Sequence, residues 1–466
     1  METKGLMIAA VNSGAGKTTI SLGIMAALIR KGIAVQPFKV GPDYIDTGLH
    51  FAACGRRSHN LDSWMGSEEI VKRVFYKNAR KADISVIEGV MGLYDGAKGS
   101  GIAGSSAHVA LTLNLPVILV VDVRGMARSC LALVKGFLEY EPQLNLKGII
   151  LNYASGDYYK TYLKTEIEDE LGVKVLGCLP KHNDIQIPSR HLGLLPNEEN
   201  DQLDQLISKM ADLIEQEIDV AELIELAENL AAIEMEDKEL RAPSKVRIGV
   251  ARDAGFSFYY QDSLDYLEEL GGEIHFFSPL HDQELPEVHG LYIGGGFPEM
   301  FLSRLSQNES MKDSVREAHK NGMPIWAECG GFMYLNEEIA GFTGETYSGV
   351  GIIPGQVKMS GSLAALGYVQ AKALKDSIIA ERGDVLRGHE FHYSIINGID
   401  HSAAFTLMGG KGKDFRPDGY VAGNLAASYV HLHLRSNPGV ARNLLKACEK
   451  YKLAKSELQT CEEVSI

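Results

Sequence analysis

Short apolar runs alternate with amphipathic stretches through the first 179 residues of the chain. Between these runs, apolar residues recur at helical spacing, for example over Lys17–Lys31 and Met126–Glu139. Strands that are apolar along their whole length and alternate with helices indicate a parallel sheet covered by helices on both faces. The strands predicted in this way are Leu6–Val11, Ile33–Val40, Ile84–Glu88, Val117–Asp122, Gly148–Asn152 and Val173–Cys178.

The pattern changes after residue 195 and then restarts. Apolar residues such as Leu203 and Met210 keep helical spacing within an acidic stretch, which predicts a helical connector. A new apolar strand begins near Val246, and a second alternation of strands and helices runs to about Tyr451. We therefore predict two doubly wound α/β domains with parallel sheets. Their predicted bounds are 1–195 and 245–451, with an acidic connector at 196–244 and a polar tail at 452–466.

Acidic side chains outnumber basic ones by 61 to 46, which gives a formal net charge of −15. Residues 196–241 alone hold 15 acidic and 3 basic side chains, so the two domains together are close to neutral. Neutralising phosphate groups needs surplus Lys and Arg, so neither nucleic acid nor an anionic membrane is an expected partner. The six cysteines form no CxxC pair, and the longest apolar run is far shorter than the ~20 residues of a membrane span. These features predict a reduced, cytoplasmic protein.

A glycine-rich loop joins the first predicted strand to the first predicted helix. In such a loop, backbone N–H groups point at phosphate oxygens, and the helix N-terminus adds partial positive charge. Lys17 would reach the β- and γ-phosphates and the Thr18 hydroxyl would bind Mg²⁺, although Val11 stands where the strict motif requires glycine. The predicted phosphate-binding residues are Ser13, Gly14, Ala15, Gly16, Lys17, Thr18 and Thr19.

Two acidic loops follow the second and third predicted strands. Because ligands bind beyond the carboxyl ends of parallel strands, these loops and the phosphate loop should face one crevice. A single acidic loop is more often a cap or solvated surface, but three glycine-containing loops at one edge favour a ligand site. Glu88 is the first choice as a carboxylate ligand of Mg²⁺, and Asp46 is the second.

The second candidate centre is Cys329, which lies between an apolar strand and the helical sequence that begins at Gly330. A sharp turn of this kind exposes a nucleophile, and a helix N-terminus lowers the pKa of a thiol. The backbone N–H of Gly330 would serve an oxyanion hole, together with Gly295 and Gly296 of an upstream triglycine. The alternative is an inert, buried cysteine.

The nucleophile would need a histidine base. His431 and His433 alternate along a predicted strand and would point to the same face. His389 and His392 form a rival pair. Either pair could bind zinc, but no third ligand cluster accompanies them, which leaves that interpretation weak. The residues therefore favour His431 as the base, without excluding the other pair.

The motifs at the two centres together resemble those of the cobyrinate a,c-diamide synthase family, and the resemblance covers essentially the whole chain. The segments that carry it are Ser13–Thr18, Gln36–Asp46, Glu88–Gly96, Arg190–Leu194 and Gly388–Ser394. The resemblance implies a P-loop domain similar to dethiobiotin synthetase, followed by a class I glutamine amidotransferase domain. It implies Cys329 as the nucleophile and His431 as the general base. His433 stands where most class I amidotransferases have glutamate, so the third triad member stays open, with His433 as a candidate support.

The resemblance also implies a reaction. ATP with Mg²⁺ would convert the a and c acetate carboxylates of cobyrinate to acyl phosphates, and ammonia released from glutamine would convert these to amides, in cobalamin biosynthesis. The residues expected around the substrate carboxylate and ammonia are Asp43, Tyr44, Asp46 and Asp95. Hydrogenobyrinate and nickel sirohydrochlorin are alternative substrates, and a nucleotide-dependent switch with an inactive amidotransferase-like domain is an alternative class. The expected partners are small molecules, and a homodimer stays open.

Overall fold

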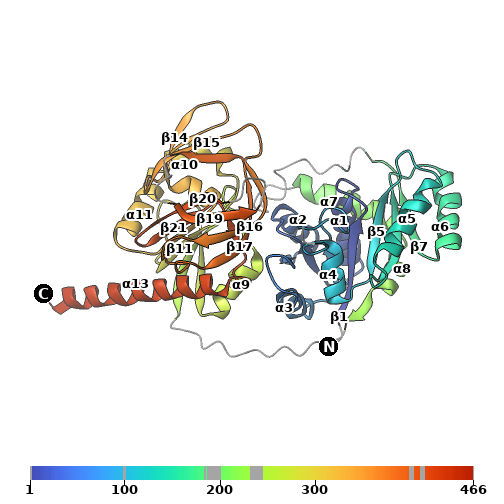
Figure 1. Cartoon of the computed structure of the whole chain (residues 1–466), viewed down its shortest axis with the longest axis horizontal. Helices are drawn as coiled ribbons and strands as arrows, with labels where there is room; N and C mark the ends of the chain where they lie inside the picture. The colour runs from blue at the N-terminus through green and yellow to red at the C-terminus, as the bar shows by residue number, and fades with distance from the viewer. Residues whose placement is uncertain are drawn as a thin grey trace. The chain divides into compact units, whose positions relative to one another are not determined.

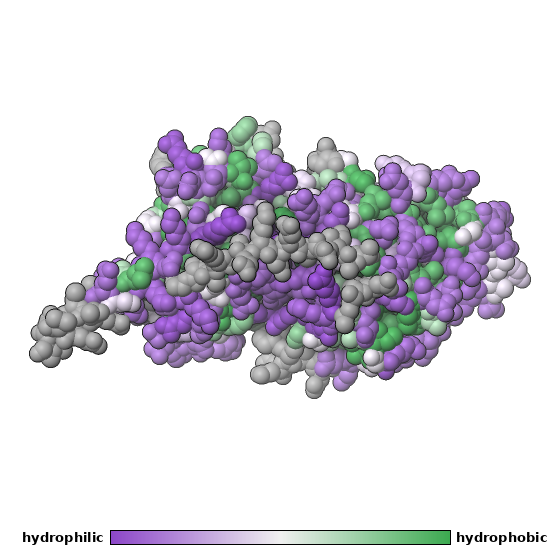
Figure 2. All heavy atoms as spheres, turned by 90° about the horizontal axis from the view of Figure 1, so that it is seen from below, coloured by the Kyte–Doolittle hydropathy of each residue, from purple (hydrophilic) through white to green (hydrophobic). Residues whose placement is uncertain are grey.

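The computed structural model describes residues 3–97, 101–182, 185, 201–230, 245–397, 403–409 and 415–464. The chain divides into two compact units, Met1–Glu236 and Asp237–Ile466, and each is described by itself (Figure 1). The motif at 190–194 that contributed to the family resemblance lies outside the described residues. None of the described helices is long and apolar enough to span a membrane. The face seen in Figure 2 is hydrophilic over most of its described surface, with hydrophobic residues in smaller groups.

The first unit is built on a parallel sheet with strand order β3-β2-β4-β1-β5-β6-β7, and β8 pairs antiparallel with the start of β1. Each of the six predicted strands corresponds to a strand of this sheet, whereas the short β3 and β8 were not predicted. The strands are β1 (Thr3–Ala10), β2 (Val35–Val40), β3 (His59–Leu61), β4 (Ile84–Glu88), β5 (Val117–Asp122), β6 (Leu146–Asn152), β7 (Lys174–Leu179) and β8 (Glu228–Leu230).

Helices cover both faces of this sheet, each over its own apolar core. The doubly wound fold predicted for this part of the chain is therefore confirmed. The helices are α1 (Lys17–Arg30), α2 (Ile45–Cys54), α3 (Glu68–Ala79), α4 (Ser106–Leu113), α5 (Ser129–Tyr140), the π-helix η1 (Tyr158–Leu163), α6 (Lys164–Leu171), α7 (Asp201–Glu217) and α8 (Val220–Leu226).

Helix α7, which lies in the segment predicted as an acidic connector, packs against α1 of the first unit (Figure 1). Its apolar stripe, including Met210 and Ile214, is buried in the same core as the α1 residues. Gly23 of α1 allows this approach, since a Cβ there would overlap Ile214 and the Met210 carbonyl. The acidic residues on the rest of α7 stay on the outside of an otherwise apolar contact.

The second unit has a ten-stranded mixed sheet with order β10-β9-β11-β12-β21-β20-β19-β16-β17-β22. Its first five strands are parallel, and antiparallel pairing begins between β21 and β20. The parallel strands are β9 (Val246–Ala251), β10 (Gly272–Phe277), β11 (Gly290–Ile293), β12 (Ile325–Glu328) and β21 (Leu425–Ser428), and the others are β16 (Ala365–Ala373), β17 (Val385–His392), β19 (Ala403–Gly409), β20 (Arg416–Ala422) and β22 (His431–Leu432).

The regular alternation predicted up to Tyr451 does not hold over the middle of this unit. Between α12 and α13 the described residues form strands, some of them in a separate four-stranded sheet, and β16 alternates buried and more exposed positions, as half-buried antiparallel strands do. The four strands are β13 (Asn336–Ala340), β14 (Thr346–Ser348), β15 (Ile353–Met359) and β18 (Ser394–Asn397).

Helix α13 continues from Pro438 through Val464, so the predicted polar tail is helical over residues 452–464. The other helices of the second unit are α9 (Gln261–Glu269), the 3₁₀-helix η3 (Pro298–Met300), α10 (Leu302–Gln307), α11 (Glu309–Lys320) and α12 (Gly330–Leu335).

Candidate functional site

The predicted phosphate loop connects β1 to α1, and its backbone depends on glycine. Gly14 and Gly16 have φ values of 79° and 96°, a region that L side chains rarely adopt. A Cβ on Gly16 would also overlap the Asn152 side chain, whose amide donates to the Ala15 carbonyl at 2.8 Å. Asn152, at the end of β6, therefore holds the loop at the carboxyl edge of the sheet.

Lys17 lies folded against this loop. Its ammonium group donates to the carbonyl oxygen of Met91, in the predicted acidic loop after β4, and lies 3.5 Å from the Asn12 carbonyl. Burial, together with the nearby positive charge of Lys39, lowers the pKa of Lys17 to about 8. The two loops predicted to share one crevice thus meet through the phosphate-loop lysine.

Glu88 is fully buried at the end of β4 and is surrounded by donors. Its Oε1 accepts hydrogen bonds from Thr18 Oγ1 at 2.7 Å and Lys39 Nζ at 2.9 Å, and its Oε2 lies 2.7 Å from His50 Nε2. Burial opposes the charge on Glu88, but Lys39 and His50 outweigh it and hold its pKa below the usual value. Prediction from the sequence missed Lys39 and His50 as its partners.

Lys39 also forms an ion pair of 2.7 Å with Asp46. Burial and the nearby negative charges of Asp43 and Glu88 raise the pKa of Asp46 to about 8. Lys39 lowers this pKa but does not offset these effects. Glu88 and Asp46 therefore share one lysine, Lys39, as their ion-pair partner. Carboxylate and hydroxyl oxygens are the ligands that Mg²⁺ prefers, so Thr18, Asp46 and Glu88 fit this cation.

The other acidic residues predicted at this centre have local backbone partners. Asp43 Oδ1 accepts from the N–H groups of Ile45 and Asp46 at 2.9 Å each, which fixes the entry to α2. Asp95 Oδ2 accepts from the Gly92 N–H at 2.9 Å. Tyr44, which directly precedes α2, is buried. These contacts define the shape of the loops around the Glu88 cluster.

A pocket of about 280 Å³ adjoins the phosphate loop within the first unit. Gly16 and Thr19 line one side of it, and the guanidinium of Arg124 lies over the Tyr153 ring at 4.2 Å on another. The remaining lining residues are Ile20, Asn152, Leu179, Pro180, Lys181, His182, Ile185, Met210, Leu213 and Ile214. A cavity with both polar and apolar lining beside a phosphate loop suits the nucleoside part of a nucleotide.

Cys329 occupies a strained turn in the second unit. Its φ and ψ are 46° and −101°, its N–H donates to the Ser428 carbonyl at 2.8 Å, and helix α12 begins at the next residue. A Cβ on Gly331 would overlap the Ile293 carbonyl, so glycine lets the turn lie against the end of β11. This is the geometry of a nucleophile elbow.

The structure brings the predicted base and oxyanion-hole residues to this turn. A Cβ on Gly295 would lie 2.4 Å from His431 Cε1 and 3.4 Å from Cys329 Cβ, so the backbone of Gly295 lies between these two side chains. A Cβ on Gly330 would lie 3.1 Å from the Gly296 nitrogen. The backbone N–H of Gly330 interacts with the thiol, and the Gly296 nitrogen lies close to Gly330, an arrangement that suits an oxyanion hole.

The expected lowering of the thiol pKa is wrong. Burial raises the pKa of Cys329 well above its usual value, and the negative charge of Glu299 adds to this effect. Helix α12 has only six residues and does not compensate. Burial also lowers the pKa of His431 to about 3, so the resting pair is a neutral thiol and a neutral imidazole. A neutral imidazole is able to accept the thiol proton.

The other three candidate histidines, His433, His389 and His392, each have different neighbours. His433 Nδ1 lies 2.9 Å from Ser436 Oγ, and its Nε2 lies 3.6 Å from Asp262 Oδ2. His389 of the rival pair lies opposite His431 in the pairing of β17 with β22, and burial lowers its pKa to about 4. His392 stacks on the ring of Tyr429 with ring centroids 3.9 Å apart.

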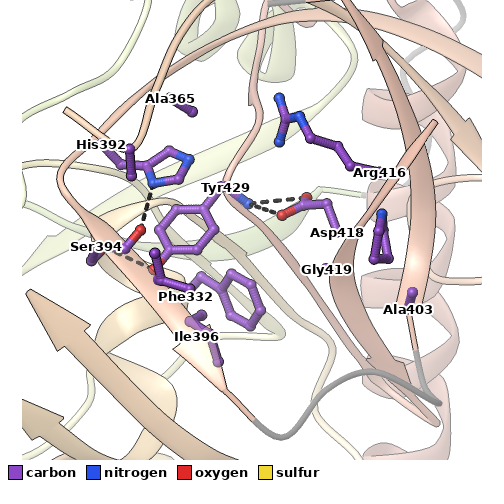
Figure 3. Close-up of a pocket in the computed structure, with 13 residues that line it drawn as sticks. Phe332, Ala365, His392, Ser394, Ile396, Ala403, Arg416, Asp418, Gly419 and Tyr429 are labelled. Carbon is purple, nitrogen blue, oxygen red and sulfur yellow. Dashed lines mark hydrogen bonds between the residues drawn. The ribbon is translucent and has the colours of Figure 1, made fainter. Parts of the chain in front are cut away.

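The second unit has a pocket of about 310 Å³ (Figure 3). Phe332 of α12 and Tyr429, which follows the Ser428 partner of Cys329, form part of its wall. Its polar lining comes from His392, Ser394, Arg416 and Asp418, and its other lining residues are Ala364, Ala365, Ile395, Ile396, Ala403, Pro417 and Gly419.

The charged side chains of this pocket, Arg416 and Asp418, form hydrogen bonds with other residues, but one donor of Arg416 has no partner among the described residues. Arg416 donates to both carboxylate oxygens of Glu390, but its buried Nε has no hydrogen-bond partner among the described residues. Asp418 accepts from Ser428 Oγ at 2.5 Å and lies beside the Tyr429 N–H (Figure 3). Burial, with help from Glu390, raises the pKa of Asp418 to about 6. The side chains of Asp418 and Arg416 thus line the same cavity.

Known proteins resemble this chain along both units. Residues 6–195 match the family model of the CobQ/CobB/MinD/ParA nucleotide binding domain, and residues 247–439 match that of the CobB/CobQ-like glutamine amidotransferase domain. A cobyrinate a,c-diamide synthase of Caldanaerobacter subterraneus subsp. tengcongensis is 46% identical over 96% of this chain and 98% of its own length. Proteins of the same name from Picrophilus torridus and Listeria innocua are 43% and 42% identical over 96% and 95% of this chain, and 99% of their own lengths.

Proposed function

Because the chain belongs to the cobyrinate a,c-diamide synthase family of amidotransferase-type ligases, we propose that it amidates the a and c acetate carboxylates of cobyrinate. ATP and glutamine are the co-substrates, and the product serves cobalamin biosynthesis. One observation carries the proposal: a phosphate loop beside a buried Glu88 cluster and a nucleophile elbow beside His431 occur in one chain.

In the second unit, the thiol proton of Cys329 moves to His431 as the sulfur attacks the amide carbon of glutamine. The N–H groups of Gly295, Gly296 and Gly330 stabilise the oxyanion that forms. Ammonia then leaves with the proton returned by His431, and water hydrolyses the thioester to glutamate. Because both resting groups are neutral, the attack and the proton transfer are coupled, with no stored thiolate.

Glutamine binds in the 310 Å³ pocket of the second unit. The Asp418 carboxylate pairs with its α-ammonium group, and Arg416, which lines the same pocket, supplies positive charge for its α-carboxylate. Tyr429 and Phe332 contact the aliphatic part of the side chain, which directs the amide toward Cys329. The pocket thus has a partner for each chemical group of the amino acid.

In the first unit, ATP places its phosphates on the loop Ser13–Thr19 and its adenine in the 280 Å³ pocket. Lys17 leaves the Met91 carbonyl and binds the β- and γ-phosphates, where its charge stabilises the transferring phosphoryl group. Thr18, Glu88 and Asp46 would hold Mg²⁺, which would neutralise charge on the phosphates when bound. Asp43, Tyr44, Asp46 and Asp95 surround the substrate carboxylate and the incoming ammonia.

Three measurements test this proposal. The protein is first supplied with ATP, glutamine and one of three substrates: cobyrinate, hydrogenobyrinate or nickel sirohydrochlorin. Mass spectrometry of the products should show diamide formation from cobyrinate. Preference for another tetrapyrrole would reassign the substrate. Cys329→Ala should abolish glutamine-dependent amidation and retain amidation with ammonium salts. A wild-type protein that hydrolyses ATP but releases no glutamate would instead be a nucleotide-dependent switch.

A further inference from the structure

Glu328 is the last residue of β12 and directly precedes Cys329, yet its side chain is only 2% exposed. One carboxyl oxygen, Oε1, accepts the backbone N–H of Leu432 at 2.9 Å. The other, Oε2, is hydrogen-bonded to the hydroxyl of Tyr292 at 2.8 Å. A buried carboxyl group with two such contacts joins three separate segments of the second unit.

Each of these segments carries one part of the candidate glutaminase site. Leu432 follows His431 in β22, while Cys329 follows Glu328 itself. Tyr292 lies in β11, which leads into the Gly294–Gly296 loop of the oxyanion hole. Base, nucleophile and oxyanion hole are therefore linked through a single side chain.

The segment that carries the base depends on such side-chain contacts. Strand β22 has only two residues and pairs with β17 through Gly388 and His389. The N–H of Leu432 donates to Glu328, and the N–H of Leu434 donates to Ser263 Oγ at 2.9 Å. Side-chain acceptors thus replace a second neighbouring strand at this edge of the sheet.

The oxyanion loop is held from the same side. The aromatic ring of Tyr292 packs flat on Trp326 with ring centroids 4.2 Å apart, and edge-to-face on Tyr259 at 5.1 Å. The hydroxyl of Tyr259 accepts the Gly294 N–H at 2.8 Å. A shift of Tyr292 would therefore reach the first residue of the triglycine.

We propose that Glu328 is a positioning residue for glutamine hydrolysis, whose carboxyl group sets the base-bearing segment and the oxyanion loop relative to Cys329. The inference rests on the proposed glutaminase reaction. Glu328 acts through Leu432 and Tyr292, so it is distinct from the catalytic residues. Its effect is on geometry, where a displacement of ~1 Å in a catalytic group costs about 10²-fold in rate.

The chemistry of Glu328 makes glutamine the conservative replacement. Burial in an apolar layer raises the pKa of Glu328 to about 8, so the carboxyl group is mainly neutral at pH 7. Glutamine has the same shape and no charge, can accept the Leu432 N–H and can donate to the Tyr292 hydroxyl. Methionine fills a similar volume but offers only a weak acceptor.

The test compares Glu328→Gln and Glu328→Met in glutamate-release assays with the full chain. We expect E328Q to stay within threefold of wild type, and E328M to lose about 30- to 100-fold in kcat with KM for glutamine changed less than threefold. Amidation from ammonium salts reports on the intact fold and should not change in either variant. Glu317→Met, at an exposed position of α11, is the matched control and should behave as wild type.

Tyr292→Phe provides a second test if E328M fails to fold. It removes one contact of Glu328 and keeps the aromatic packing, and we expect kcat to fall between threefold and tenfold with KM preserved. Wild-type kcat in a folded E328M, or equal losses in E328Q and E328M, would overturn the inference. A rise in KM without loss of kcat would also overturn it. A wild-type protein without glutaminase activity would instead refute the proposed function.

Discussion

Gly295→Ala tests the geometry of the candidate glutaminase site with a single added methyl group. The backbone of Gly295 lies outside the region of positive φ, so alanine fits the local conformation. Its Cβ would lie 2.4 Å from His431 Cε1 and 3.3 Å from His431 Nδ1. The same Cβ would lie 3.4 Å from Cys329 Cβ, which is ordinary van der Waals contact. The substitution therefore displaces the base and leaves the nucleophile in place.

The size of the effect follows from these distances. Carbon atoms pack best at about 3.5–4.0 Å, so His431 has to retreat by about 1 Å. The imidazole is buried and packs near Phe258, with ring centroids 6.3 Å apart, so it cannot turn into solvent. A misplacement of ~1 Å lowers a catalytic rate by about 10²-fold, equivalent to about 2.7 kcal/mol in the barrier.

The assay measures kcat for glutamate release and, separately, amidation driven by ammonium salts. We expect the first rate to fall by about 100-fold and the second to stay unchanged. Gly439→Ala is the control in the same unit, because its Cβ would meet no atom within 4 Å. Undiminished glutamate release by G295A would refute the placement of His431 beside Cys329, and equal loss of both activities would indicate misfolding.

Three further variants test the other parts of the account. Lys17→Ala should lower ATP-dependent amidation by about 10²–10³-fold and leave glutamate release measurable; full synthesis would refute the phosphate-loop assignment. Gly16→Ala should raise the KM for ATP about tenfold or more. A left-handed backbone conformation costs an L-residue roughly 1–2 kcal/mol, and the added Cβ would in addition overlap Asn152. An unchanged KM would contradict the role of the loop. For wild type, KM for glutamine should rise as pH falls below about 6, because protonated Asp418 no longer pairs with the α-ammonium group. Asp418→Asn should raise KM at pH 7.5 and remove this dependence on pH. A pH profile of the variant identical to that of wild type would refute the contact.

The strands and turns of both centres follow from local sequence patterns. Continuous apolar runs predict buried parallel strands, and glycines at strand ends predict loops where backbone must approach a ligand. For this reason the phosphate loop, Glu88 and Cys329 could each be placed at the carboxyl end of a strand from the sequence. The positive φ values of Gly16 and Cys329 agree with that placement.

Properties that depend on long-range contacts could not be predicted in the same way. The thiol pKa of Cys329 rises because of burial, and burial is set by residues distant in the sequence. Lys39 and His50 become partners of Glu88 only when β2 and α2 pack beside β4, although a lone lysine in an apolar strand is a signal that could have found Lys39. The sequence predicts Glu328 only as the end of a buried strand, because its two contacts come from β11 and β22, which are distant in the sequence.

The antiparallel half of the second sheet was missed for a related reason. Its strands, such as β16, are half-buried and carry polar residues on one side, so they lack the continuous apolar runs that identified the parallel strands. Helix α7 shows the opposite case, because its acidic composition suggested a connector while its apolar stripe packs on α1. In both elements the pairing partner, rather than composition, decides the structure.

The central claim is that glutamine hydrolysis at Cys329 supplies the nitrogen for ATP-dependent amidation of cobyrinate. Its most direct test is mass spectrometry of the product formed from cobyrinate, ATP and glutamine labelled with ¹⁵N at the side-chain amide. We expect a diamide that carries ¹⁵N at both new amides for wild type, and no labelled product for Cys329→Ala. Unlabelled diamide, or labelled diamide formed equally well by the Cys329→Ala variant, would contradict it.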